Sequence, residues 1–202
     1  MNFHSYNPQD GHGLKHNPFK ALISPRPIGW ISSRSAEGIS NLAPYSFFNA
    51  LSETPPLLGF SSSGRKDSLR NIEATGAFVH NVAGHELVTQ MNASSAPYDH
   101  EISEIEMLGL ATLPGDVVDV PRLAEAPASF ECKLVDIRQL EDHKGAKLQN
   151  YLIIGEVVRV HIQERFIQDG MIDEAALAAV GRLGYFNYAA VSDIFALARP
   201  KL

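Results

Sequence analysis

Hydrophobic residues of this 202-residue chain fall mainly into short runs separated by Gly, Pro and Ser, a pattern typical of many short strands. Gly38, within SAEGIS, predicts a tight turn after the first run. The polar segment EDHKGAK separates the last two runs and predicts a β-hairpin. The strand-like runs cover residues 27–33, 41–52, 55–63, 77–83, 129–140 and 148–162. The sheet should therefore be mainly antiparallel.

Helical spacing is confined to a few short segments. Asp67 is a good N-cap, Leu69 and Ile72 lie three apart, and Gly76 is a good terminator, so this stretch predicts a short helix over 67–76. Further helices are expected at 85–94, 102–110 and 175–180, the second of them within a Pro-containing excursion outside the barrel at 94–128.

Many strands and few helices, without βαβ alternation, predict a mainly β fold, a closed or partly closed antiparallel barrel with peripheral helices. No repeat or low-complexity segment divides the chain. We expect one domain over residues 1–202, with its core at about 20–191.

Composition excludes several classes of partner. At 45% hydrophobic and 20% charged residues, the chain has enough apolar material for a folded core. Its formal net charge of −6 offers no basic field for nucleic acid or anionic lipid. It has no signal-peptide h-region and no run of roughly 20 apolar residues, and its lone Cys132 cannot form an intramolecular disulfide. We expect a cytoplasmic protein without nucleic-acid or membrane partners, with Cys132 in the core.

The segment FSSSGRKDS, residues 60–68, is a candidate phosphate site. A strand is expected to end there, and a helix begins after a Ser- and Gly-containing loop. Backbone N–H groups at a helix N-terminus favour an anion, and the Arg and Lys of the loop add positive charge. A plain capped turn is the alternative interpretation.

The strand-like segment NLAPYSFFNA offers a wall for a planar heteroaromatic ligand. Amide and hydroxyl groups of Asn41, Ser46 and Asn49 stand among aromatic side chains, and such a mixture matches the apolar and hydrogen-bonding edges of an isoalloxazine ring. The alternative is that the aromatic residues are core and the polar ones face water.

Other chemistries lack sequence support. Neither GxGxxG nor GxxxxGK[ST] occurs, so a Rossmann site or a P-loop is not indicated. GxSxG is absent, and the eight histidines show no HExxH and no metal-ligand spacing tied to Cys132, so no metal site is expected.

Several stretches together resemble the flavin reductase-like family of FMN-binding split-barrel proteins, which includes flavoredoxin-like flavoproteins. The resemblance runs from about Pro25 to Ala189 and depends on the order and spacing of the stretches. They are PRPIGWISS (25–33), EGISNLAPYSFFNALSETPP (37–56), GFSSSGRKDSLRNIEATGAFVHNV (59–82), GLA with AEAPASFECKL (109–134), GEVVRVHI (155–162) and GRLGYFNYA (181–189). The resemblance implies a six-stranded antiparallel Greek-key split barrel and a homodimer with FMN in a groove near the subunit boundary.

The resemblance also implies where FMN is held. The NLAPYS stretch would line the ring, and the Ser-rich loop with the RKDS turn would hold the ribityl phosphate. Trp30 would be an aromatic neighbour of the ring, or alternatively a core residue. The implied cofactor-binding residues are Trp30, Asn41, Ala43, Pro44, Tyr45, Ser46, Ser61, Ser62, Arg65, Lys66 and Ser68.

The implied activity is that of an FMN-dependent oxidoreductase that reduces flavin or another acceptor with electrons from NADH or NADPH. The flavin carries the chemistry, so no catalytic side chain is expected. A nicotinamide would stack over the exposed ring face, and His161, Arg182 and Tyr185 are the candidates for that side.

Two departures from the family pattern keep alternatives open. Leu148-Gln149-Asn150 stands where reductase partners of two-component monooxygenases often carry Gly-Asp-His, and Tyr185 follows Gly184 where RLGG is frequent. One alternative is an FMN-binding electron carrier that a protein partner reduces, without nicotinamide activity. Another is an unliganded barrel used for protein contacts, which the basic Ser-rich turn disfavours.

Overall fold

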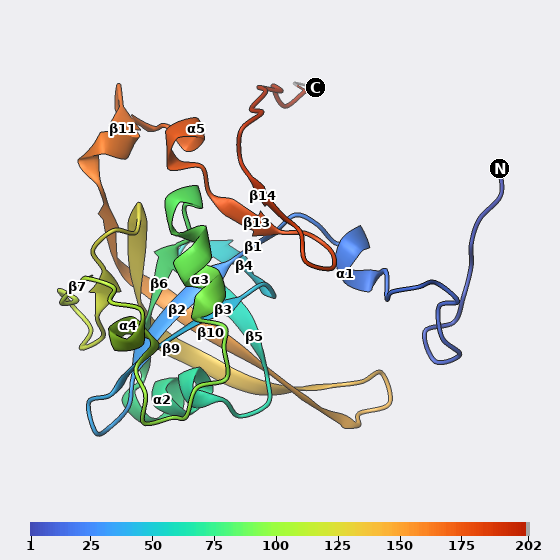
Figure 1. Ribbon diagram of the computed structural model, residues 1–202, viewed down its shortest axis with the longest axis horizontal. Coiled ribbons are helices and arrows are strands. Elements are labelled where there is room, and N and C mark those ends of the chain that lie inside the picture. Colours follow the sequence, from blue (N-terminus) through green and yellow to red (C-terminus); the bar gives the residue numbers. More distant parts are fainter. Residues whose placement is uncertain (201–202) are drawn as a thin grey trace.

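The computed structural model describes residues 1–200, and strands dominate it (Figure 1). The helical elements are α1 (Phe19–Leu22), α2 (Asp67–Thr75), η1 (His85–Leu87), α3 (Val88–Ala93), α4 (Glu104–Met107), η2 (Glu164–Phe166) and α5 (Glu174–Leu177). The strands are β1 (Arg26–Pro27), β2 (Gly29–Arg34), β3 (Ser40–Tyr45), β4 (Phe48–Glu53), β5 (Pro56–Ser63), β6 (Ala77–Val82), β7 (Thr112–Leu113), β8 (Arg122–Leu123), β9 (Ala128–Glu141), β10 (Lys147–Ile162), β11 (Ile167–Gln168), β12 (Met171–Ile172), β13 (Val180–Arg182) and β14 (Tyr188–Ala190). None of the helices within residues 1–200 has the length and apolar character needed to span a membrane.

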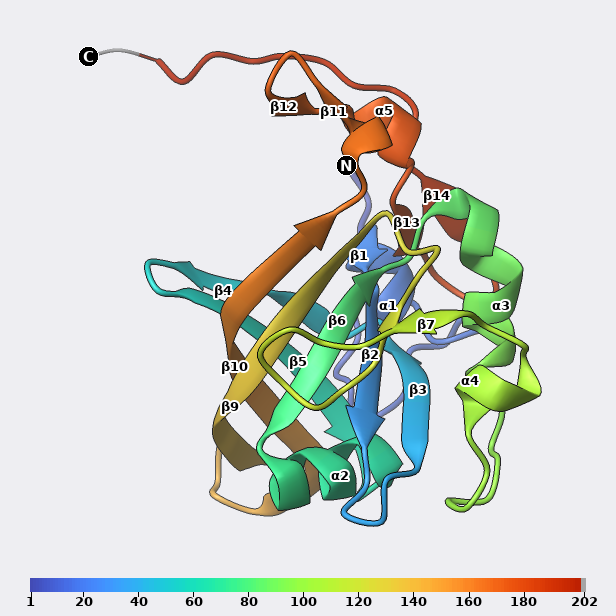
Figure 2. The same cartoon turned by 90° about the vertical axis from the view of Figure 1, so that its left-hand side faces the viewer.

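The main sheet has the strand order β3-β2-β6-β9-β10-β5-β4, and every neighbouring pair is antiparallel. The sheet curls, so that β3 and β5 approach each other (Figure 2). The rings of Tyr45 and Phe60 lie 4.6 Å apart there, and the Ser61 N–H donates to the Phe47 carbonyl over 2.8 Å. The result is the partly closed antiparallel barrel that the strand pattern predicts. It has seven strands rather than six, because β3 and β4 are separate strands with only residues 46–47 between them.

One core fills the barrel, and α2 lies across one end of it (Figure 2). Leu69 and Ile72 of α2 are fully buried against it, and Gly76 ends the helix in the left-handed conformation with φ 72°, as the sequence predicts. Cys132 is fully buried in the same core, and burial raises the pKa of its thiol. The prediction that Cys132 is a core residue is confirmed.

Gly155 of β10 lies against this core at a point where there is no room for a side chain. The ring of Phe78, on β6, reaches across β9 to lie against it. A Cβ atom at Gly155 would lie 2.6 Å from Cζ of Phe78 and 3.1 Å from Cβ of Cys132. Glycine is therefore required here for close packing.

A second core lies on the other face of β2 and β3, where α3 and α4 pack beside β3. Trp30 is fully buried in it together with Leu42 and Met91. Its indole Nε1–H donates to Ser94 Oγ over 2.9 Å. Because β2 has one core on each of its two faces, successive residues are buried, and buried and exposed positions do not alternate along the strand.

The prediction of a helix over 175–180 is wrong for residues 178–180. α5 ends at Leu177, and Ala178 takes a left-handed conformation with φ 47°. Val180 then begins β13 and pairs with Ala190 of β14. Long-range strand pairing therefore overrides the local helix preference of the alanines.

Candidate functional site

The largest cavity near the predicted site residues lies between β3, the start of α2 and the segment that follows α3. It encloses about 530 Å³, within the usual range for small-molecule and cofactor sites. We call it the first cavity. Its lining residues are Asn41, Ala43, Pro44, Tyr45, Arg65, Lys66, Asp67, Ser68, Arg70, Ser94, Ser95, Ala96, Pro97, Tyr98, Asp99, His100 and Glu104.

The N-terminus of α2 forms one end of the first cavity. No side chain caps this nine-residue helix at Lys66, so its first backbone N–H groups lack a side-chain acceptor. Ser68 in the first turn is almost fully buried, and its hydroxyl accepts a 2.9 Å hydrogen bond from the side-chain amide of Asn41 on β3. This bond ties the helix start to the strand wall and fixes both sides of the cavity.

The cations at this end differ in how they are compensated. Arg65 forms an ion pair with Glu73, and its guanidinium lies 5.8 Å from the Tyr151 ring centroid. Arg70 lies 3.8 Å from the Asp67 carboxylate. For Lys66, no ion pair is found among residues 1–200. Lys66 is therefore the cation most available to an anionic group in the cavity.

Two buried ionisable groups line the wall of the cavity. Burial raises the pKa of the Tyr45 phenol, and the nearby Ser68 and Ser62 hydroxyls oppose this rise; within the described part of the chain, however, neither meets the geometry of a hydrogen bond to the phenol oxygen. The Glu104 carboxylate accepts a 2.8 Å hydrogen bond from the Leu42 N–H, yet burial raises its pKa above the ordinary value. An orphaned buried phenol in a cavity wall fits a polar ligand that supplies the missing partner.

A second, smaller cavity of about 270 Å³ adjoins the first and shares Pro44 and Ser95 with it. Arg182 here donates to the Tyr185 carbonyl over 2.7 Å and lies 4.3 Å from the Tyr188 ring centroid. Its lining residues are Lys20, Arg26, Ile28, Pro44, Ser46, Met91, Asn92, Ser95, Arg182, Leu183, Tyr185 and Tyr188. The two cavities are therefore neighbours at the end of β3, and we call them together the groove.

Comparison with known proteins decides the family. The sequence model of the flavin reductase like domain matches residues 22–186. The chain belongs to the flavin reductase-like family.

Three solved structures show what this flavin reductase-like chain is similar to. Nitrilotriacetate monooxygenase component B from Bacillus cereus is 33% identical, with a TM-score of 0.88 over 98% of this chain and 100% of its own. The 2-nitrobenzoate 2-nitroreductase of Pseudomonas fluorescens is 32% identical, with a TM-score of 0.80 over 90% and 88%. A split-barrel protein of Shewanella frigidimarina is 26% identical, with a TM-score of 0.80 over 90% of each chain. The predicted split-barrel fold is thereby confirmed.

The flavin reductase-like chain brings most of the expected residues together. Asn41, Ala43, Pro44, Tyr45, Arg65, Lys66 and Ser68 line the first cavity, and Ser46, Arg182 and Tyr185 line the second. These residues fit a flavin, because one end offers cations and helix N–H donors and the β3 wall offers apolar surface with backbone polar groups.

Three of the expected cofactor-binding residues do not line either cavity. Ser62 is fully buried, and its hydroxyl donates to the Gly64 carbonyl over 3.0 Å. The Ser61 hydroxyl is buried without a hydrogen-bond partner in the described residues. Trp30 lies in the second core, which favours the core interpretation over contact with the ring.

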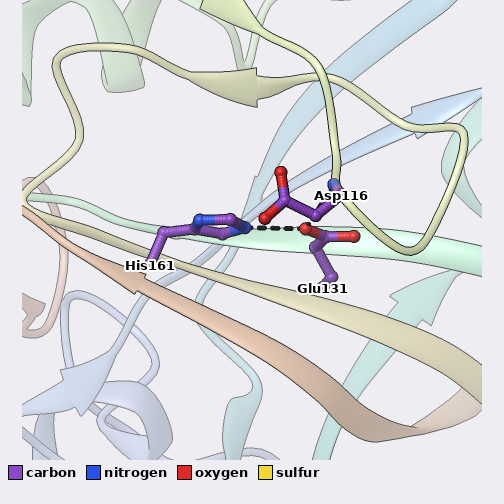
Figure 3. Close-up of side chains that lie close together, drawn as sticks. All are labelled: Asp116, Glu131 and His161. Atoms are coloured by element: carbon purple, nitrogen blue, oxygen red, sulfur yellow. Dashed lines mark hydrogen bonds and ion pairs between the residues drawn. The ribbon is translucent and has the colours of Figure 1, made fainter.

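His161 lies away from both cavities, in a cluster with Glu131 and Asp116 (Figure 3). The His161 Nε2 atom is 2.7 Å from the Glu131 carboxylate, which is fully buried. Burial disfavours the charged form of Glu131, but hydrogen bonds from His161 and from the N–H groups of residues 116–118 outweigh it and lower the pKa to about 2. These hydrogen bonds hold the 114–121 loop against β9 and β10.

This cluster has the composition of a metal site but not the free ligand atoms. Glu131 Oε1 faces the Asp116 N–H and His161, and Oε2 accepts from the N–H groups of Val117 and Val118. Four donors occupy the four lone-pair positions of a carboxylate. The Asp116 carboxylate meanwhile pairs with Arg159 over 3.0 Å. A cation would have to displace several of these bonds, so the arrangement favours a structural role.

Sequence reasoning missed part of the groove. Residues 94–100 and Glu104, assigned to an excursion outside the barrel, line the first cavity. Lys20 and Arg26 line the second and precede the recognised motifs. Pro and Ser in SSAPYDHE predict a loop, but no local pattern predicts that this loop packs back against β3.

Proposed function

We propose that this chain binds FMN in the first cavity and works as an FMN-dependent oxidoreductase. The observation that carries the proposal is the uncapped start of α2, with Lys66 and Ser68, facing the β3 wall in one cavity. The phosphate would lie at the helix start, where N–H groups and the helix dipole favour an anion. The ring would lie along the backbone of residues 43–45.

The distribution of charge supports a mononucleotide rather than a dinucleotide in the first cavity. Its cations, Arg65, Lys66 and Arg70, come from one short segment at one end. A dinucleotide needs its two phosphates held near the middle of the ligand, and the sequence lacks the Gly-rich fingerprint for that. One phosphate at one end matches FMN.

The bound flavin would supply hydride and electron transfer, while the protein supplies binding and environment. Tyr45 stays neutral because burial raises its pKa, so it can donate a hydrogen bond without adding charge. Residues 94–100 line the first cavity opposite β3, so they would lie against the bound flavin. No side chain in this scheme acts as acid or base.

NADH or NADPH is the proposed electron donor, with Arg182 and Tyr185 on the side where it would approach. Relatives named as a nitroreductase and as a monooxygenase component support the oxidoreductase class. His161 is left out of this scheme because it pairs with Glu131 at a distance from the groove.

An FMN-binding electron carrier that a protein partner reduces is the second candidate. Leu148-Gln149-Asn150 in place of Gly-Asp-His favours it, and these residues begin β10 on an exposed part of the barrel. The two candidates differ in one measurable property. The oxidoreductase is reduced rapidly by a nicotinamide, whereas the carrier is reduced by dithionite or a reductase partner only.

Absorption spectra of gently purified protein, before and after added FMN, test the cofactor. Anaerobic stopped-flow mixing with NADH or NADPH, followed at roughly 450 nm where flavins absorb, then separates the two candidates. Prompt bleaching supports the nicotinamide-linked enzyme. Protein that neither contains nor takes up FMN would overturn the proposal.

The Lys66→Ala variant tests the phosphate end. It should weaken FMN binding by about 1–3 kcal/mol, the scale of a lost charge-assisted hydrogen bond, with little effect on folding. Lys144→Ala, in the exposed β9–β10 turn, is the matched control and should bind FMN normally. Equal FMN affinity of both variants in fluorescence titrations would mean that the phosphate lies elsewhere.

A homodimer with FMN near the subunit boundary is proposed as the assembly. Phe47, just before β4, is 40% exposed and Leu51, on β4, is 50% exposed, and exposed apolar side chains of this kind support a further contact there. Light scattering of the FMN-loaded protein should give twice the mass of 22.1 kDa. A monomer mass at micromolar concentration would refute this assembly.

A further inference from the structure

The second cavity concentrates positive charge on a chain whose net charge is −6. Lys20 of α1, Arg26 of β1 and Arg182 of β13 all line it. Among residues 1–200, no Asp or Glu lines this cavity, and none forms an ion pair with these three cations. Uncompensated like charges that share one concave surface favour an anionic ligand.

Arg26 is a fixed part of this charge. Its guanidinium donates to the carbonyls of Lys20 and Ile23, and to that of Leu183 over 2.9 Å. Burial, and then the neighbouring charge of Arg182, lowers the pKa of Arg26. Arg26 therefore sets the sign of the local field while its hydrogen bonds stay within the protein.

Arg182 and Lys20 retain donors for a ligand. Arg182 uses one terminal nitrogen on the Tyr185 carbonyl and stacks on the Tyr188 ring, so the planar guanidinium is held in one orientation with other N–H groups left over. The Lys20 ammonium lies 5.8 Å from the Phe47 ring centroid and has no acidic partner in the described chain.

The remaining lining is mixed: the polar residues are Ser46, Asn92 and Ser95, and the apolar and aromatic residues are Ile28, Pro44, Met91, Leu183, Tyr185 and Tyr188. The volume of about 270 Å³ can enclose a ligand of one ring, whereas a nicotinamide dinucleotide could place only its nicotinamide end inside it. Pro44 also belongs to the first cavity, so a ring here would lie next to whatever occupies the β3 wall.

We propose that the second cavity binds a small aromatic carboxylate, with its carboxylate at Arg182 and Lys20 and its ring among the apolar side chains. Its placement beside the flavin rests on the proposed function, whereas the binding of the anion does not. An isosteric neutral compound lacks the charge that the two cations recognise, so the cavity should discriminate strongly between an acid and its amide.

Calorimetric titration of the protein with benzoate and with benzamide, with and without added FMN, tests this. We expect benzoate to bind at least about tenfold more tightly than benzamide, and Arg182→Gln and Lys20→Gln each to lose about tenfold for benzoate alone. Arg165→Gln is the matched control, because Arg165 also stacks on an aromatic ring, that of Phe166, and lies outside this cavity.

Each outcome decides one point. Equal binding of benzoate and benzamide, or benzoate binding that neither cavity variant weakens, overturns the proposal. Inorganic phosphate that displaces benzoate at equal or lower concentration identifies a phosphate subsite and also overturns it. If FMN fails to bind while benzoate still discriminates as expected, the proposed function fails and the anion site stands.

Discussion

Replacing Trp30 by Phe tests how the second core supports the groove. Trp30 is fully buried in the same core as Leu42 and Met91, and its indole N–H donates to the Ser94 hydroxyl. Ser94 itself donates to the Met91 carbonyl over 2.9 Å and begins the 94–100 segment that lines the first cavity. The substitution keeps an aromatic ring in place but removes the donor and part of the volume.

The expected cost follows from two terms. Loss of the buried hydrogen bond costs about 1 kcal/mol, or somewhat more because the Ser94 oxygen loses a donor in a buried place. A residual void of about 40 Å³, at roughly 24 cal/mol per Å³, adds about 1 kcal/mol. The free energy of unfolding should therefore fall by about 2–3 kcal/mol. For a chain of this length the melting temperature should fall by roughly 4–12 °C.

Urea unfolding of flavin-free protein, followed by circular dichroism, measures this cost. Flavin must be absent, since a ligand of the native state would add its own stabilisation. Ser94→Ala and the double variant complete a cycle in which Trp30 and Ser94 should couple by about 0.5–1.5 kcal/mol. A cost below about 0.5 kcal/mol for Trp30→Phe, or strict additivity in the cycle, would refute the reasoning.

Three further predictions concern other buried contacts. Gly155→Ala should cost about 1–3 kcal/mol of unfolding free energy by overpacking Phe78, and an unchanged melting temperature would contradict this. Glu131→Gln should lower the free energy of unfolding by about 2 kcal/mol at pH 7. The difference in this free energy between the parent protein and the variant, measured in urea, should become smaller as the pH falls from 4.5 towards about 2. Glu131, whose pKa is lowered in the native state, becomes protonated in the parent protein over this range. A stability difference that stays constant from neutral to acid pH would contradict the prediction that ionised Glu131 stabilises the native state. Cys132 should resist thiol reagents in the native protein and react fully in urea, because burial raises the pKa of its thiol; rapid labelling of the native protein would contradict it.

Local signals predicted much of the fold. Apolar spacing and a terminating glycine predicted the helix over 67–76, and α2 covers Asp67–Thr75; Asp67 lies in its first turn, whereas the N-cap is Lys66 and not Asp67 as predicted. The hairpin at 129–162 was indicated by two long apolar runs, which became β9 and β10. The helix expected at 175–180 failed because Val180 pairs with Ala190, a contact that no local pattern contains.

The site was predictable only where its residues sit in contiguous segments. NLAPYS and the RKDS turn could be located from strand and helix-start signals, and their side chains do line one groove. Ser61 and Ser62 do not line the cavity, because side-chain direction along β5 depends on register and curl. Lys20 lines the second cavity only because tertiary packing brings α1 there, which no local pattern predicts. His161 lines neither cavity, and its imidazole is hydrogen-bonded to Glu131.

The contact between Gly155 and Phe78 links two positions that are distant in the sequence. A larger residue at 155 has no room unless 78 becomes smaller, and a smaller residue at 78 leaves a void unless 155 grows. The two sites should therefore change together across related chains, with Gly paired to an aromatic ring. In an engineered chain, shrinking Phe78 should make Ala at 155 tolerable, so the harm of each change depends on the other.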